Sequence, residues 1–423
     1  MCHNNFMEKY QIQGGYPLSG EIKVAGAKNA ALKIIAASIL SEDTSTIKNV
    51  PEIEDINRLI EILRNLDADI SRDDSTLTIS TKDIIRSDPD PKLVKQLRSS
   101  IMLAGPLLAR FGEVTMAHPG GCIIGKRPID MFLAGFKKMG AEVIDHQDFF
   151  TLKAKKLKGA KIVLPWTAVT VTESLMLTAC LASGTTTIIN SAMEPEIPAL
   201  AEYLNKQGAK ISGAGSPIIT IKGVDKLSAG TYEIMPDRIE AGSFVMMGLA
   251  TGSEIKVTNC RPEHLDTVLL MLEKTGAKLE IGADFIKTKK SKFNATELRT
   301  HEYPGFPTDL QAPFTVLMTQ AQGQSLIHET IYDGRLFYTD KLSNMGASII
   351  MCDPHRVIVT GPTKLMGRTL ESPDLRAGMA LVIAGLIAEG ETTIENIYQI
   401  ERGYENIVDR LQNLGAKIEK INS

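Results

Sequence analysis

The stretch NLDADI at residues 65–70 returns five more times along the chain, and this recurrence decides the fold. The later copies read KMGAEV at 138–143, KQGAKI at 206–211, KTGAKL at 274–279, NMGASI at 344–349 and NLGAKI at 413–418. The alanines of successive copies lie 68 to 73 residues apart. Self-similarity at a near-constant period is the signature of a repeated structural unit. The 423-residue chain is therefore expected to consist of six related units.

Each copy has the same kind of neighbours. An amphipathic stretch precedes it, such as EHLDTVLLMLEKTGA at 263–277, and its apolar spacing and terminal glycine predict a surface helix. Two short alternating runs follow, such as ASIIMCDPHRVIVTG at 347–361, and predict a strand hairpin. An apolar segment comes next, such as DLRAGMALVIAGLIAEG at 374–390, and predicts a buried helix. We expect each unit to run strand, buried helix, strand, surface helix, strand, strand.

The unequal ends of the chain predict how the units are divided. No hairpin precedes the first buried segment, and the last copy stops after one hairpin strand. We therefore expect the N-terminal strands to close the C-terminal half, with crossings near Ala27 and Met235. A chain of 423 residues also exceeds the roughly 250 to 300 at which a single core stops growing. The prediction is an α/β protein with three units in each of two domains, one formed by 28–235 and the other by 1–27 with 236–423.

The composition excludes several classes of partner. A net charge of -3 argues against nucleic acid or an anionic membrane as a ligand. The longest apolar runs are about half as long as a bilayer span requires, and the first ten residues lack a signal-peptide core. The five cysteines form no CxxC pair and no metal-like spacing, which predicts a reducing, cytoplasmic location without a metal or cofactor. Cys180 lies in an apolar run and is expected to be buried. Nothing in the sequence implies an obligate protein partner.

Cations at the starts of several buried segments point to an anionic ligand. These residues are Lys28, Arg98, Arg238 and Arg376. A polar cap is the structural alternative for any single position, but a helix N-terminus already carries about half a positive charge. An anionic ligand would supply the missing negative charge. If the buried helices of a domain run parallel, we expect these N-termini to gather in a positively charged cleft between domains. Asp237, Asp309 and Asp374 would then be ion-pair partners of the cations, and one of them is a candidate general base.

The loop HPGGCIIGKRPID at 118–130 is an insertion relative to the other units. Ala117, at the end of the preceding predicted strand, lies 24 residues before the repeat alanine Ala141. In the first unit the corresponding separation, from Asn49 to Ala68, is 19 residues. The loop is rich in glycine and places Cys122 close to Lys126 and Arg127. Nearby cations lower the pKa of a thiol from about 8.5. Taken alone, the loop fits either a reactive thiol beside an anion site or a turn with an incidental cysteine, and its being an insertion favours the first.

Eight motifs, in order, resemble the UDP-N-acetylglucosamine 1-carboxyvinyltransferases, a branch of the enolpyruvyl transferase family. They are GAKNAA at 26–31, RSSI with GPLLARFG within 98–112, PGGCIIGKRPID at 119–130, MEPEIP at 193–198, PDRIEAG at 236–242, FPTDLQA at 306–312, DLRAG at 374–378 and ERGYENI at 401–407. The resemblance implies a two-domain inside-out α/β barrel. It also implies that the enolpyruvyl group of phosphoenolpyruvate moves to the 3-hydroxyl of UDP-N-acetylglucosamine, with release of phosphate, in the committed step of peptidoglycan synthesis.

The resemblance also implies roles for individual residues. Cys122 would be the loop thiol that acts in protonation or product release and that fosfomycin alkylates. Asp309 would take the hydroxyl proton, with Asp374 assisting, and Lys28 and Arg402 would complete the catalytic set. The substrate-binding residues would be Lys28, Asn29, Arg98, Arg127, Pro128, Ile129, Asp130, Asp309, Ile331, Arg376 and Arg402.

Three departures from the family pattern concern the nucleotide. Trp166, Ala168 and Thr170 stand where the family often has Lys, Ser and Gly, and Phe132 replaces a family His. Trp166 is the only tryptophan and could stack on a base or pack, packing being the simpler expectation. The alternatives in function are a 3-phosphoshikimate 1-carboxyvinyltransferase-like enzyme, which lacks the cysteine loop, and a non-catalytic sugar-nucleotide-binding paralogue, which would not need the thiol.

Overall fold

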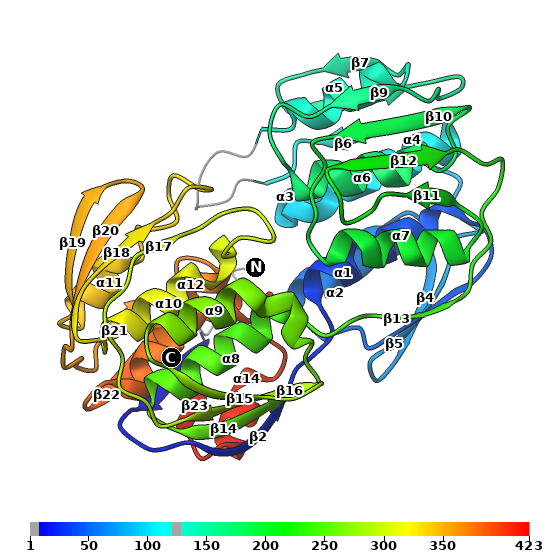
Figure 1. Ribbon diagram of the computed structural model, residues 1–423. Helices are drawn as coiled ribbons and strands as arrows, with labels where there is room; N and C mark the ends of the chain where they lie inside the picture. The colour runs from blue at the N-terminus through cyan, green and yellow to red at the C-terminus, as the bar shows by residue number, and fades with distance from the viewer. Residues whose placement is uncertain (1–7, 121–127, 423) are drawn as a thin grey trace. The chain divides into compact units, whose positions relative to one another are not determined.

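The computed structural model of the chain describes residues 8–120 and 128–422. These residues form two compact units, each with mixed helices and strands (Figure 1). The first unit comprises 26–120 with 128–235, and the second comprises 8–25 with 236–422.

The first unit contains, in chain order, α1 (Lys28–Ala37), η1 (Ser38–Leu40), β3 (Ser45–Lys48), α2 (Glu54–Asn65), β4 (Asp69–Asp73), β5 (Thr76–Ser80), α3 (Pro91–Gln96), η2 (Arg98–Leu103), α4 (Ala104–Phe111), β6 (Glu113–Ala117), α5 (Asp130–Lys138), β7 (Glu142–Asp145), β8 (Phe149–Lys153), β9 (Lys161–Val163), α6 (Val169–Ala179), β10 (Thr185–Ile189), α7 (Glu196–Lys206), β11 (Lys210–Ser212), β12 (Ile218–Lys222) and β13 (Thr231–Glu233).

The second unit contains β1 (Glu8–Gln13), β2 (Ser19–Lys23), α8 (Arg238–Ala250), β14 (Glu254–Thr258), η3 (Pro262–Leu265), α9 (Asp266–Lys274), β15 (Lys278–Ile281), β16 (Phe285–Lys289), β17 (Leu298–Arg299), η4 (Thr308–Leu310), α10 (Gln311–Met318), β18 (Gly323–His328), α11 (Thr339–Asn344), β19 (Ser348–Asp353), β20 (Arg356–Gly361), β21 (Thr369–Glu371), α12 (Leu375–Ile387), β22 (Glu391–Glu395), α13 (Tyr398–Glu401), α14 (Ile407–Asn413) and β23 (Lys417–Asn422).

The strands of each unit form three sheets in which late strands pair with early ones. In the first unit the orders are β13-β3-β5-β4, β6-β8-β7 and β11-β12-β10-β9. In the second unit they are β15-β16-β14-β2, β17-β18-β20-β19 and β21-β22-β1-β23. Strand β13 runs parallel to β3, so the last strand of the first unit completes its first sheet.

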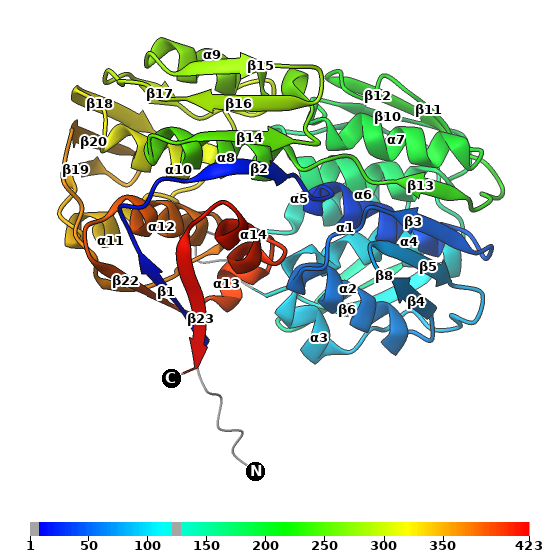
Figure 2. The same cartoon turned by 90° about the horizontal axis from the view of Figure 1, so that it is seen from below.

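The N-terminal strands pair within the second unit (Figure 2). Strand β2 runs parallel to β14, and β1 lies antiparallel between β22 and β23. Strand β1 thereby supplies the hairpin strand that the last repeat lacks.

The repeated sequence motif forms the same C-terminal helix cap six times. The glycine of five copies has a positive φ, between 91° and 101°, and Asp67 takes this place in the first copy with φ 72°. The following alanine donates its N–H to the carbonyl five residues earlier, as Ala68 does to Leu63 at 3.0 Å and Ala416 to Leu411 at 3.0 Å. This bond is the 6→1 bond of the Schellman motif, which requires a left-handed residue beside it. Each copy of the repeated sequence motif therefore marks the C-terminal end of a helix.

A second repeated device lies at the ends of strands β3, β10, β14 and β22. The residues that follow these strands are Asn49, Asn190, Asn259 and Asn396, each with a positive φ. Each side-chain amide donates to a carbonyl just beyond the neighbouring parallel strand, for example Asn49 to Ile234 at 2.8 Å. Asparagine tolerates the left-handed conformation better than most residues. The same residue therefore makes the turn after the strand and donates a hydrogen bond to a carbonyl just beyond the neighbouring parallel strand.

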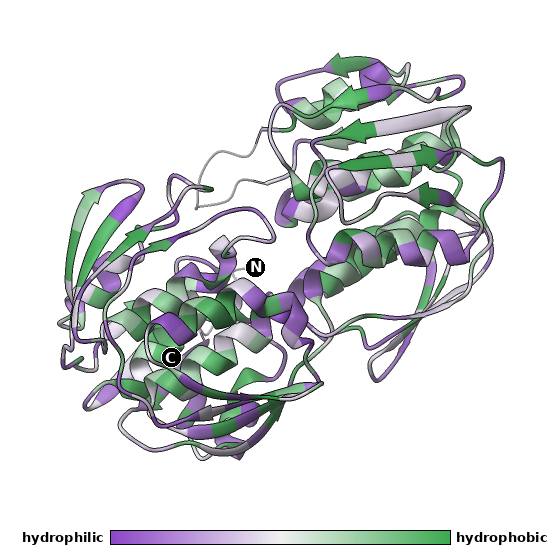
Figure 3. Cartoon of the chain, viewed as in Figure 1, coloured by the Kyte–Doolittle hydropathy of each residue, from purple (hydrophilic) through white to green (hydrophobic). Residues whose placement is uncertain are grey.

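The buried helices α8, α10 and α12 pack against one another inside the second unit. Their side chains are almost all buried, and Figure 3 shows them as mostly apolar ribbons. Burial on nearly every side removes the amphipathic pattern that surface helices such as α2 retain.

The second repeat departs from the predicted unit. The stretch 98–112 was expected to be one buried helix, but it forms the 3-10 helix η2 followed by α4. Pro106 contributes to the break because it has no N–H to donate to the preceding turn. The strand expected ahead of this segment is also absent from the described residues, where helix α3 stands instead, and the β6-β8-β7 sheet has three strands.

Two expectations about single residues have opposite outcomes. Cys180 is 1% exposed, so the prediction of a buried cysteine is confirmed, and burial raises the pKa of its thiol to about 12. The expectation that Trp166 packs is wrong, because its side chain is 57% exposed. Trp166 follows a proline in the bend between β9 and α6, outside either periodic element. Residues 8–120 and 128–422 contain no helix that is both long and apolar enough to cross a bilayer.

Candidate active site

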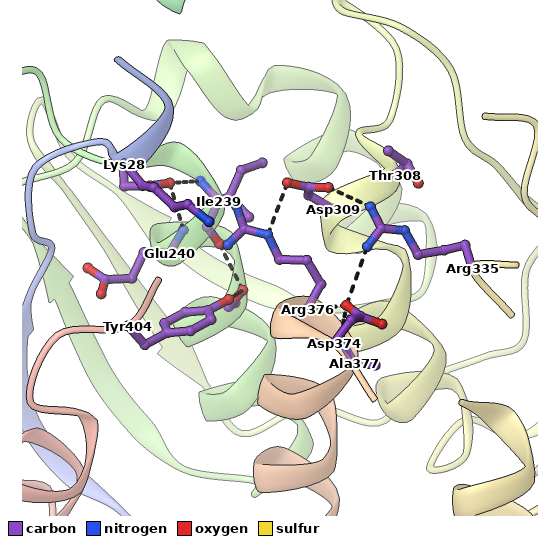
Figure 4. Close-up of polar contacts among 12 residues, drawn as sticks. Lys28, Ile239, Glu240, Thr308, Asp309, Arg335, Asp374, Arg376, Ala377 and Tyr404 are labelled. Carbon is purple, nitrogen blue, oxygen red and sulfur yellow. Dashed lines mark hydrogen bonds and ion pairs between the residues drawn. The ribbon is translucent and has the colours of Figure 1, made fainter. Parts of the chain in front are cut away.

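Asp309 lies between two arginines in the second unit (Figure 4). Its Oδ1 accepts a hydrogen bond from Arg335 at 2.7 Å, and its Oδ2 accepts one from Nε of Arg376 at 3.0 Å. The arginine side chains are 2% and 5% exposed, whereas that of Asp309 is 25% exposed. The carboxylate therefore faces solvent on one side and two buried cations on the other.

The aspartates before α8 and α12 are helix caps. Asp237 accepts from the backbone N–H groups of Ile239 and Glu240 at 2.8 and 3.1 Å. Asp374 accepts from the N–H groups of Arg376 and Ala377 at 2.8 and 3.2 Å. A side-chain oxygen that satisfies the free N–H groups of a first turn stabilises the helix by about 1 kcal/mol. From the sequence, ion pairing or a catalytic role was expected for these aspartates, and the structure adds helix capping.

Asp374 also contacts the arginine pair, since its Oδ1 lies 3.6 Å from Arg335 (Figure 4). Burial lowers the pKa of the Arg335 guanidinium, but Asp309 and Asp374 outweigh that effect and the pKa is raised. Burial also lowers the pKa of Arg376, but Asp309, Tyr404 and Asp237 together outweigh that effect and the pKa is raised. Both arginines therefore remain charged.

Tyr404 and Arg402 follow α13 in this unit. The ring of Tyr404 lies 5.9 Å from the Arg376 guanidinium carbon, and its hydroxyl is 3.0 Å from Oγ of Ser243 on α8. Burial raises the pKa of Tyr404, so its hydroxyl is neutral. Arg402 donates to the side-chain oxygen of Gln399 at 3.0 Å. These contacts connect Tyr404 to α8 and α12, and Arg402 to α13.

Ile331 lies just after β18, in the loop that leads to Arg335. Its N–H donates to Oε1 of the buried Glu329 at 2.8 Å. The loop contains a second contact, in which the Arg335 guanidinium lies 5.2 Å from the ring of Tyr332. Ile331 and Arg335 therefore lie in the same short turn, which hydrogen bonds to Glu329 hold in place.

The first unit places Lys28 at the start of α1. Its Nζ forms an ion pair with Asp55 of α2 at 2.6 Å, and both side chains are less than 10% exposed. One turn later on the same helix, Lys33 pairs with Glu173 of α6 at 3.3 Å. Both cations of α1 therefore have carboxylate partners inside this unit.

The other site residues predicted in the first unit are spread over several elements. Arg98 opens η2 and points toward the carbonyl of Pro119, at 3.5 Å. Asn29 follows Lys28 on α1 and is partly buried. At the start of α5, Pro128 and Asp130 are exposed, and Ile129 is buried. Cys122 and Arg127 lie outside the described residues.

Arg335 is the residue that sequence reasoning missed. It stands in YDGRLFYTD, which matches neither a helix nor a strand period. Its buried side chain contacts the carboxylates of Asp309 and Asp374, which makes it as central to the cluster as Arg376. The only available signal was a lone arginine that follows a glycine turn, which is weak evidence. Within residues 8–120 and 128–422, no group of three or more His, Cys, Asp or Glu side chains is arranged to hold a metal ion.

Comparisons with known proteins agree on the family. The family profile described as EPSP synthase (3-phosphoshikimate 1-carboxyvinyltransferase) matches residues 12–411. A UDP-N-acetylglucosamine 1-carboxyvinyltransferase from Desulforapulum autotrophicum is 44% identical over 416 residues, covering 98% of this chain and all of the relative. One of the same name from Borreliella burgdorferi is 40% identical over 426 residues, covering 99% of this chain and all of the relative.

Solved structures share the fold at lower identity. The enolpyruvyl transferase NikO from Streptomyces tendae aligns with a TM-score of 0.89 at 24% identity, over 99% of both chains. An EPSP synthase from Acinetobacter baumannii aligns with a TM-score of 0.74 at 19% identity, over 98% of this chain and all of that one. With the full-length relatives, these matches place the chain in the EPSP synthase (enolpyruvyl transferase) family, among the UDP-N-acetylglucosamine 1-carboxyvinyltransferases.

Proposed function

We propose that this chain transfers the enolpyruvyl group of phosphoenolpyruvate to the 3-hydroxyl of UDP-N-acetylglucosamine. A proton adds to the vinyl carbon of the donor while the sugar hydroxyl adds to the neighbouring carbon and loses its proton. The resulting tetrahedral adduct then loses phosphate and a proton to regenerate the double bond. The products are enolpyruvyl-UDP-N-acetylglucosamine and inorganic phosphate.

One observation carries this proposal. The relatives that are 40% to 44% identical over at least 98% of the chain bear the name UDP-N-acetylglucosamine 1-carboxyvinyltransferase. The arrangement around Asp309 supports it independently, because two buried, charged arginines beside a partly exposed carboxylate suit a substrate that carries phosphate and carboxylate groups.

Asp309 is the proposed base for the sugar hydroxyl. Each carboxylate oxygen has about two acceptor positions, and the two arginines occupy one on each oxygen. A hydroxyl can therefore approach the exposed side of the carboxylate. The arginine contacts stabilise the ionised carboxylate, which is the form that a base requires. Asp374, which contacts Arg335 and caps α12, is proposed to assist proton transfer.

The remaining predicted residues are proposed to bind the two substrates. Lys28, Arg98, Arg127, Arg376 and Arg402 would hold the phosphate and carboxylate of the donor. Asn29 and Asp309 would contact the amino sugar, and Arg127, Pro128, Ile129, Asp130 and Ile331 would lie along the nucleotide. Cys122 would act from its loop, either in protonation or in product release.

We also infer the finer architecture. The three sheets and the buried helices of each unit are proposed to form one half of a two-domain inside-out α/β barrel, with three repeats in each domain. Closure of the first unit by β13 and of the second by β1 and β2 supports this inference. The proposed domain boundaries are those expected from the sequence, near Ala27 and Met235.

The test is phosphate release from phosphoenolpyruvate with each of two acceptors. We expect release with UDP-N-acetylglucosamine and none above background with shikimate 3-phosphate. Release with shikimate 3-phosphate alone would move the chain to the shikimate branch of the family. Tight binding of UDP-N-acetylglucosamine without release under any condition would make it a non-catalytic binding protein.

A further inference from the structure

Glu329 occupies a position that the sibling repeats use differently. It is the first residue after β18, the strand that follows buried helix α10. The corresponding residues after β3, β10, β14 and β22 are the left-handed asparagines at 49, 190, 259 and 396. Glu329 does not have a positive φ, and its side chain is completely buried. A buried carboxylate is costly unless it is fully bonded, so its presence here calls for an explanation.

The Glu329 side chain makes three hydrogen bonds. Its Oε1 accepts from the backbone N–H groups of Ile331 and Tyr332 at 2.8 and 3.2 Å. Its Oε2 accepts from the hydroxyl of Thr308 at 2.9 Å. One carboxylate therefore ties the turn after β18 to the first residue of η4.

The backbone of Glu329 is fixed as well. Its N–H donates to the carbonyl of His355 at 2.8 Å, and its own carbonyl lies 2.9 Å from Nδ1 of the same histidine. The next residue, Thr330, bonds Thr300 through both its N–H and its hydroxyl. The carboxylate thus projects from a strand end that is fixed by hydrogen bonds. It can therefore fix the positions of Thr308 and of the turn at Ile331 and Tyr332.

Both segments that Glu329 holds lead directly to the candidate active site. Thr308 immediately precedes Asp309, and Figure 4 shows the two side by side. Tyr332 accepts from the N–H of Arg335 through its carbonyl, at 3.2 Å. Arg335 in turn donates to Asp309 at 2.7 Å. The Glu329 carboxylate therefore bonds to both segments that carry the Asp309–Arg335 contact.

We propose that Glu329 is a positioning residue that fixes Asp309 and Arg335 in register for the enolpyruvyl transfer, an inference that rests on the proposed function. An asparagine, as in four of the sibling repeats, has a single carbonyl oxygen and a shorter side chain, and it could not accept all three bonds in this geometry. Glutamine keeps the length and one acceptor oxygen, and its amide can donate to the Thr308 hydroxyl. The role therefore depends on bonding geometry more than on charge.

The experiment compares paired variants by steady-state phosphate release, thermal unfolding and crystal structure. Thr308→Val removes the hydroxyl with little change in shape, and Thr308→Ser keeps it. Glu329→Gln keeps the bonds, whereas Glu329→Ala removes them. We expect kcat to fall between about 10- and 100-fold in Thr308→Val, with the KM for phosphoenolpyruvate changed less than about 3-fold and an unchanged melting temperature. Thr308→Ser and Glu329→Gln should stay within about 3-fold of the parent kcat.

Several results would overturn the inference. A Thr308→Val enzyme with parental kcat, or a Thr308→Ser enzyme as impaired as Thr308→Val, removes the positioning role. So does a Glu329→Gln enzyme that matches an inactive Glu329→Ala enzyme, because the charge would then be the requirement. The crystal structures test the inference even if the proposed reaction is wrong. They should show the 2.7 Å Asp309–Arg335 contact lengthened in Thr308→Val and kept in Glu329→Gln, and the opposite pattern contradicts it.

Discussion

Glutamine in place of Glu173 should stabilise the first unit, and increasingly so as the pH rises. Glu173 is 0% exposed on α6, and within the part of the chain that the structure describes its oxygens accept no hydrogen bond of good geometry. Lys33 pairs with it at 3.3 Å, while Glu196 and Glu194 oppose its charge. Burial dominates and raises the pKa of Glu173 from 4.5 to about 8.

The magnitude follows from linkage between protonation and folding. The folded protein keeps the Glu173 proton up to about pH 8, whereas the unfolded chain releases it above 4.5. The stability that Glu173 contributes is thus complete below pH 4.5 and is lost as pH rises toward 8. At about 1.4 kcal/mol per pH unit, the loss is roughly 3 kcal/mol at pH 7 and about 5 kcal/mol above pH 8. Glutamine is neutral at every pH and avoids this loss.

The assay is urea unfolding between pH 5 and 9, followed by the fluorescence of Trp166. This residue is the only tryptophan and lies in the first unit, so it reports on the relevant transition. The Glu173→Gln protein should gain stability over the parent as the pH increases. The control is Glu202→Gln on the exposed side of α7, whose surface pair with Lys206 is worth less than about 1 kcal/mol. Parallel pH curves for Glu173→Gln and the parent would refute the reasoning.

Two further predictions concern the chemistry. Asp309→Ala should lower kcat by at least about 100-fold with a much smaller change in phosphoenolpyruvate binding, measured by steady-state kinetics and calorimetry; parental turnover would exclude Asp309 as the base. Fosfomycin should add once, at Cys122, and not at Cys180, because burial raises the pKa of Cys180 to about 12; peptide mapping that finds the adduct on Cys180 contradicts this.

The repeated features of the fold were predictable because they depend on local chemistry. The glycine–alanine pairs mark helix ends at which a left-handed residue and a 6→1 hydrogen bond are required, and Gly140 or Gly415 meets that need without strain. The first copy keeps the pattern because Asp67 also adopts a positive φ. Where local chemistry is interrupted, as by Pro106, the prediction of one continuous helix fails.

The candidate site was predictable only where its residues stand at helix starts. Asp309, Asp374 and Arg376 belong to such positions, and the structure brings them together in the second unit. Arg335 and Glu329 lie in a turn without periodicity, and their importance arises from contacts with residues more than twenty positions away. Only the folded arrangement reveals contacts of that kind.

Phosphate release from phosphoenolpyruvate with UDP-N-acetylglucosamine as acceptor tests the central claim most directly. The purified chain should release one phosphate for each enolpyruvyl-sugar nucleotide formed, and shikimate 3-phosphate should not replace the acceptor. Absence of release with UDP-N-acetylglucosamine, from protein that is folded and binds both substrates, would contradict the proposed function.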